Sequence, residues 1–104
     1  MKTPARIKER PSASALHLAA QGGHSKICDL LLETKQLTVD DTDLNLMTPL
    51  HYAAMHSHYE VARVLVQNDA NCLFKDKLNV LPLHMAAKSG DLSVFKFIFM
   101  STDR

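Results

Sequence analysis

The sequence predicts an all-α fold built from a repeated helical unit, and three observations support this. The run Thr48-Pro49-Leu50-His51-Tyr52-Ala53-Ala54 is typical of a helix start. Thr48 is a good N-cap, and Pro49 suits the first helical position because its missing N–H costs nothing there. Related runs surround His17 and His84. The spacings between His17, His51 and His84 are 34 and 33 residues, and a fixed period of this kind indicates a repeat array.

The first unit contains two expected helices. Ser14 is an acceptable cap, and we expect a helix from about Ala15 to Gln21, which Gly22 and Gly23 end because glycine accepts the left-handed conformation. A second helix is expected over residues 25–33. It should bury three apolar residues at helical spacing, Ile27, Leu30 and Leu31.

The loop that follows the first unit carries three acidic residues, Asp40, Asp41 and Asp43. They lack the longer pattern of oxygen ligands that a calcium loop requires. We therefore expect a solvated acidic loop rather than a cation site.

The repeated motifs resemble those of the ankyrin-repeat family, which has a T-P-L-H-x-A-A opening, a G-H pair, a V-V-x-L-L-L helix and a closing G-A-D-V-N. The middle unit matches these motifs at Thr48-Pro49-Leu50-His51, Ala53-Ala54, His58, Val61 to Val66, Ala70 and Asp76. The resemblance covers about residues 12 to 100. It implies a solenoid of stacked helix–turn–helix units with β-hairpin fingers, used to bind other proteins, in which His17, His51 and His84 bond the hairpin and cap region.

On this resemblance the chain divides into an N-terminal arm, residues 1–11, and an ankyrin-repeat domain, residues 12–104. The repeats are expected at about 12–42, 43–75 and 76–104, the last one truncated. The arm is basic, with a docking tail as the alternative to a simple solvated segment.

The last helical pattern holds more apolar side chains than one inward face needs: Val94, Phe95, Phe97, Ile98, Phe99 and Met100. Arrays of repeats require terminal units with a polar outer face. We therefore expect further ankyrin repeats, or another element, to pack on the Phe95–Met100 end.

Several positions depart from the family pattern. Leu46, Ser57, Asp69 and Asn79 stand where the family has glycine. Asp and Asn tolerate positive φ better than most residues, so strain is expected at Leu46 and Ser57. Leu81 replaces the capping Thr of the third unit, whereas Asp91 can cap the helix that follows it.

The fingers supply the candidate binding residues. Leu44, Leu46, Met47, Leu78 and Val80 are expected to form an apolar stripe along adjacent fingertips, and exposed apolar patches often mark interaction sites. Met55, His56 and Lys88, with Gln21, Gly22 and Ser89, would line the concave face beside it. The alternative is that these side chains pack between the fingers or against another part of the parent protein.

Catalytic, cofactor and metal sites are not predicted. The six histidines invite a zinc site, but His51 and His56 are five apart on a helix and His58 lies beyond the turn. The sequence has no G-x-S-x-G elbow and only three glycines, too few for a phosphate-cradling loop. Cys28 and Cys72 are expected to be buried thiols.

The function expected is therefore a non-catalytic adaptor that binds a protein or peptide across its fingers and inner helices. The alternative is an internal section of a larger ankyrin array in a channel, kinase or scaffold; a histidine-based metal site is third. A net charge of +1 gives no push toward nucleic acid or an anionic membrane. A cytoplasmic or nuclear location is expected, since the N-terminus lacks the apolar core of a secretory signal.

Overall fold

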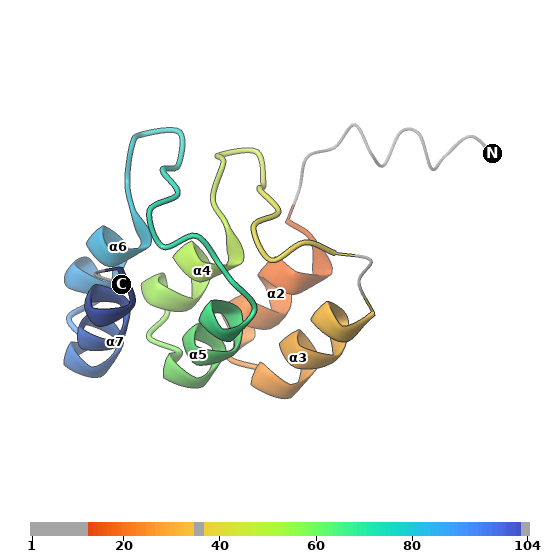
Figure 1. The fold of residues 1–104 in the computed structure, drawn as a ribbon. Coiled ribbons are helices and arrows are strands. Elements are labelled where there is room, and N and C mark those ends of the chain that lie inside the picture. The colour runs from red at the N-terminus through yellow and green to blue at the C-terminus, as the bar shows by residue number, and fades with distance from the viewer. Residues whose placement is uncertain (1–12, 35–36, 103–104) are drawn as a thin grey trace.

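The computed structural model describes residues 13–34 and 37–102, which form six helices in two rows (Figure 1). The helices are α2 (Ala15–Gly22), α3 (Ser25–Glu33), α4 (Pro49–Met55), α5 (Tyr59–Gln67), α6 (Pro82–Ser89) and α7 (Leu92–Thr102). Helices α2, α4 and α6 form the inner row, next to two finger loops, and α3, α5 and α7 form the outer row. The predicted all-α array of stacked helix pairs is confirmed, while the N-terminal arm lies outside the described residues.

The inner helices begin at the predicted caps. The hydroxyl oxygens of Ser14 and Thr48 accept the amide N–H of His17 and His51, which satisfies one of the unpaired donors at each helix start. Leu81 makes no side-chain cap bond at the start of α6. The predicted cap of α7 is present, because the carboxylate of Asp91 accepts the Val94 amide at 3.2 Å.

The turns within each helix pair share a left-handed residue. Gly23 (φ 78°) and Gly90 (φ 81°) supply it in the first and third pairs, and Ser57 (φ 62°) supplies it in the second. Asp69 also has positive φ, at 69°. The strain expected at Ser57 is therefore real, since a side chain in this region costs about 1–2 kcal/mol.

The core lies between the two rows and between successive pairs. Leu16, Leu50, Leu65 and Ile98 are the largest fully buried aliphatic side chains. Helix α4 packs on both α2 and α6. Its alanines are fully buried, and their small side chains permit the close approach of neighbouring helices.

The burial predicted for α3 is wrong at two positions. Ile27 is 50% exposed and Leu30 is 59% exposed, whereas Cys28 is completely buried. Val61 and Val94, the equivalents of Ile27 in α5 and α7, are fully buried because each packs against the preceding outer helix. No described helix precedes the first pair, so its corresponding face stays open.

The fingers are tight loops without β-strands in the part of the chain that the structure describes. Two backbone bonds close each finger. In the first, the Asp43 N–H donates to the Met47 carbonyl (3.1 Å) and the Leu46 N–H to the Asp43 carbonyl (3.0 Å). In the second, the Asp76 N–H donates to the Val80 carbonyl (3.0 Å) and the Asn79 N–H to the Asp76 carbonyl (2.9 Å). These bonds do not extend into a ladder of paired strands. The hairpin fingers implied by the family are therefore present as turns.

Candidate partner-binding surface

The first finger is built around Asp43. One carboxylate oxygen accepts the amides of Asn45 and Met47, both at 2.9 Å, and the other accepts the hydroxyl of Tyr52. Burial raises the pKa of Asp43, but the bonds from Tyr52, Met47 and Asn45 and the nearby His17 outweigh it, so the net pKa is below the ordinary value. The ionised carboxylate thus fixes the shape of the loop.

The second finger repeats this construction. The Asp76 carboxylate accepts the amides of Leu78 at 2.8 Å and Val80 at 2.9 Å. Asp76 is 33 residues after Asp43 and is buried like it. Each finger is therefore supported by two hydrogen bonds from backbone amides to its buried carboxylate, and the tips point the same way (Figure 1).

Two buried histidines fasten the fingers to the inner row. The Nε2 atom of His17 lies 2.7 Å from the Met47 carbonyl, and Nε2 of His51 lies 2.7 Å from the Val80 carbonyl. The Nδ1 atom of His51 accepts the Thr48 amide, so Nε2 carries the proton and donates it to the carbonyl. This confirms the structural role that the family resemblance implied for both histidines.

The tips of the two fingers are joined and expose leucines. The amide of Lys77 donates to the carbonyl of Asn45 at 2.9 Å, which places the two tips side by side. Leu44 is 61% exposed and Leu78 is 80% exposed. Leu46 is 45% exposed and has φ 60°, so the expected backbone strain is present and its side chain still meets solvent.

The predicted stripe is narrower than its five residues. Met47 and Val80 are half-buried, because their carbonyls are tied to the histidine rings and their amides to Asp43 and Asp76. The exposed part, called the fingertip leucines below, consists of Leu44, Leu46 and Leu78.

The remaining predicted residues lie toward the other end of the inner helices. Met55 and Lys88 are exposed near the ends of α4 and α6, and His56 is exposed just after α4. The His56 ring stacks near that of His58, with centroids 6.4 Å apart, and His58 itself bonds the Gln21 carbonyl at 2.9 Å. These residues belong to the inner row and not to the fingertips.

The solvated acidic loop was the wrong interpretation for Asp43. Asp43 is buried, and Asp40 accepts the Asn71 amide at 3.1 Å. Asp41 accepts the hydroxyl of Thr38. The sequence did carry a signal for the role of Asp43 in supporting the finger, since Asp43 and Asp76 occupy the same repeat position.

The described residues contain neither a metal-binding cluster nor a membrane-spanning helix. Within 13–34 and 37–102, no group of three or more His, Cys, Asp or Glu side chains is placed to hold a metal ion. Over the same residues, no helix combines the length and apolar character needed to cross a bilayer. Cys28 and Cys72 are both buried, as predicted, and burial raises the pKa of the Cys28 thiol to about 11.

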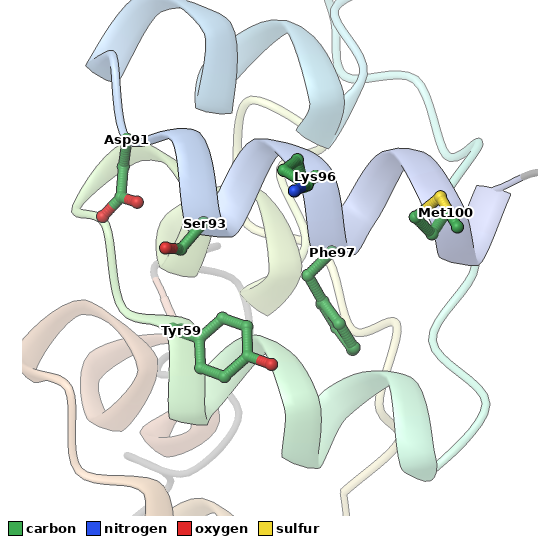
Figure 2. A pocket seen from close by; sticks show the side chains of 6 residues that line it. All are labelled: Tyr59, Asp91, Ser93, Lys96, Phe97 and Met100. Carbon is green, nitrogen blue, oxygen red and sulfur yellow. The ribbon is translucent and has the colours of Figure 1, made fainter.

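A separate hollow of about 580 Å³ lies between the outer helices α5 and α7. Figure 2 shows Tyr59 of α5 and Phe97 of α7 side by side at this hollow, and their ring centroids lie 5.5 Å apart. Asp91, Ser93 and Lys96 line it together with Met100. Its rim carries charges of both signs, and it lies in the row remote from the fingers.

The similarity of this chain to known proteins agrees with this architecture. A family model described as ankyrin repeats (3 copies) matches residues 3–76. The chain is 33% identical over 75 residues to a transient receptor potential cation channel subfamily A member 1 homolog of Caenorhabditis elegans, which covers 72% of this chain and 6% of that protein.

Two further relatives are of different kinds. Inversin of Mus musculus is 33% identical over 87 residues, covering 83% of this chain and 8% of inversin. The target of rapamycin complex 2 subunit AVO2 of Saccharomyces cerevisiae is 27% identical over 92 residues, covering 88% of this chain and 22% of AVO2. The chain thus spans less than a quarter of each of these three relatives.

Proposed function

This chain belongs to the ankyrin-repeat family, and on that premise we propose that it is a non-catalytic adaptor that binds a protein or peptide partner through the fingertip leucines. Ankyrin repeats are protein-interaction modules. The stacked helices hold the two fingers rigidly, so little conformational entropy is lost when a partner docks. The inner-row residues Met55, His56 and Lys88 would extend the surface.

One observation carries this proposal: three exposed leucines gather on two joined fingertips, and one of them, Leu46, has a strained backbone. Leu46 holds a left-handed backbone while its side chain remains 45% exposed. That conformation costs about 1–2 kcal/mol for a residue with a Cβ, and burial recovers little of this cost. Backbone strain at an exposed position is a reason to infer function there.

The test is affinity capture with three versions of the chain as bait. The finger variant is Leu44→Asp with Leu78→Asp, and the matched end variant is Leu18→Asp with Met100→Asp. All four side chains are exposed, so both variants should fold, as circular dichroism would check. We expect a specific protein retained by the original chain and the end variant but lost by the finger variant; retention by the finger variant would contradict the proposal.

The second candidate is an internal section of a longer ankyrin array. It is favoured by apolar side chains at both ends of the two rows: Leu18, Ile27, Leu30, Leu92, Phe99 and Met100 are all exposed. Ala87 is exposed although its equivalents Ala20 and Ala54 are fully buried. It lines a cavity of about 240 Å³ with Phe95 and Leu92.

His84 gives a further reason for this second candidate. His17 and His51 each donate to the carbonyl of the following finger, whereas the exposed ring of His84 bonds, among described residues, to the Leu81 amide at 3.0 Å. A following finger would complete the pattern. Capture lost by the end variant and kept by the finger variant would favour this candidate.

A further inference from the structure

The exposed charges on the second finger are cationic. Lys75 and Lys77 are both exposed, on either side of the buried Asp76, and Lys77 precedes the most exposed leucine, Leu78. The ion pair found among the described residues joins Arg63 to Glu60 on α5. Neither finger lysine is therefore paired with a carboxylate of the described chain.

The carboxylates near the fingers accept hydrogen bonds from the chain itself instead. Asp43 accepts two amides and a hydroxyl, and Asp76 accepts two amides. The Asp40 carboxylate is taken up by the Asn71 amide, at 3.1 and 3.2 Å. The joined fingertips thus offer a partner two ammonium groups and the fingertip leucines, while the acidic groups serve the loops themselves.

Resting on the proposed function, we infer that the partner segment is an acidic peptide that also carries apolar side chains. Its carboxylates would face Lys75 and Lys77, and its apolar groups would cover Leu44, Leu46 and Leu78. Complementary charge of this kind steers encounter and fixes register. A nucleic acid would supply anions but leave the leucines in water, and a net charge of +1 gives it little attraction.

An anionic membrane surface offers the same two chemistries and is the competing class. Each lysine near such a surface contributes about 1 kcal/mol, and the fingers have two. This is weak for stable membrane attachment, so the structure favours a peptide.

The experiment is selection of short random peptides displayed on phage. The chain is the target, and the Leu44→Asp, Leu78→Asp variant removes peptides that do not use the fingertips. Fluorescence anisotropy then measures the affinity of the selected peptides at about 50 and 200 mM salt, where screening differs. We expect enriched sequences with net negative charge and apolar residues, bound more weakly at the higher salt.

Two charge-reversal variants provide the decisive comparison. Lys75→Glu with Lys77→Glu should weaken binding of the selected peptides by about tenfold or more. The control, Lys26→Glu with Lys96→Glu, makes the same change in net charge on α3 and α7, where both side chains are exposed, and should change affinity by less than about twofold.

Each contrary outcome has a distinct meaning. Finger-dependent peptides that are neutral or basic, or equal weakening by the two charge variants, would overturn the acidic partner and leave the finger surface in place. Failure to enrich any peptide that distinguishes the chain from the leucine variant would overturn the proposed function. Sedimentation with vesicles of anionic lipid, lost on Leu78→Asp, would assign the surface to membranes and overturn the inference.

Discussion

The imidazole of His51 lies 2.7 Å from the carbonyl oxygen of Val80, although 29 residues separate them in the sequence. The ring is fully buried, and its other nitrogen accepts the Thr48 amide. One side chain therefore connects the start of α4 to the end of the second finger. The placement of the finger depends on this connection.

Replacing His51 tests how much this connection stabilises the fold. His51→Ala would remove the partner of the part-buried Val80 carbonyl and of the buried Thr48 amide, and we expect it to lower the free energy of unfolding by about 2–4 kcal/mol. His84→Ala is the matched control, because His84 is exposed at the same repeat position, and it should cost less than about 1 kcal/mol. Urea unfolding measures both, and equal losses would refute the role of His51.

Stability should also depend on pH through His51. Burial lowers its pKa in the folded chain, more than the Val80 carbonyl and the carboxylates of Asp76, Asp43 and Asp40 raise it. In the unfolded chain His51 has an ordinary pKa of about 6.5, so just below that pH the unfolded chain binds more protons than the folded chain does. The free energy of unfolding therefore falls as the pH drops below about 6.5.

The measurement is the urea midpoint at pH values of about 7.5, 6.5 and 5.5, on either side of the ordinary histidine pKa. His51→Gln removes the titrating group and should show a smaller decrease over this range than the original chain. An identical pH dependence in the two proteins would show that His51 does not contribute to it.

Leu46→Gly tests whether the first fingertip is strained. Glycine adopts positive φ without a Cβ penalty, so we expect stability to rise by up to about 1 kcal/mol. Asn79→Gly is the control at the same turn position, with φ 64°, and its gain should be smaller because Asn tolerates this region. Thermal melting compares the two, and a lower melting temperature for Leu46→Gly would show that the leucine side chain is packed.

The left-handed glycines allow a comparison of backbone and steric effects. An added Cβ at Gly23 would lie 2.8 Å from atoms of the His58 ring, whereas at Gly90 nothing lies within 4 Å. Both have similar positive φ. Gly90→Ala should therefore cost about 1–2 kcal/mol from the backbone alone, and Gly23→Ala should cost more; equal costs in urea unfolding would mean that His58 moves aside freely.

The sequence was sufficient to predict the regular part of the fold. The caps at Ser14 and Thr48 and the left-handed turns at Gly23 and Gly90 follow from local chemistry that a single residue type reveals. The bounds of α3 also agree with the expected range. The repeat period between His17, His51 and His84 predicted that the helix pairs stack.

The features that the sequence could not predict depend on contacts between residues that are distant in the sequence. Ile27 and Leu30 have the right spacing for burial, but their exposure follows from the absence of a described helix beside them. The sequence predicted that Asp43 is one of three solvated acids, whereas in the structure the loop folds around its carboxylate. The role inferred for Lys75 and Lys77 depends on the positions of Leu78 and of the buried carboxylates, which the sequence alone does not show.

The most direct test of a finger-bound partner is hydrogen exchange of the chain, measured alone and in complex with the captured protein or a selected peptide. We expect slower exchange at the amides of the two fingers, residues 43–47 and 75–80, with little change in α3 and α7. Protection confined to α3 and α7, with unchanged fingers, would contradict it.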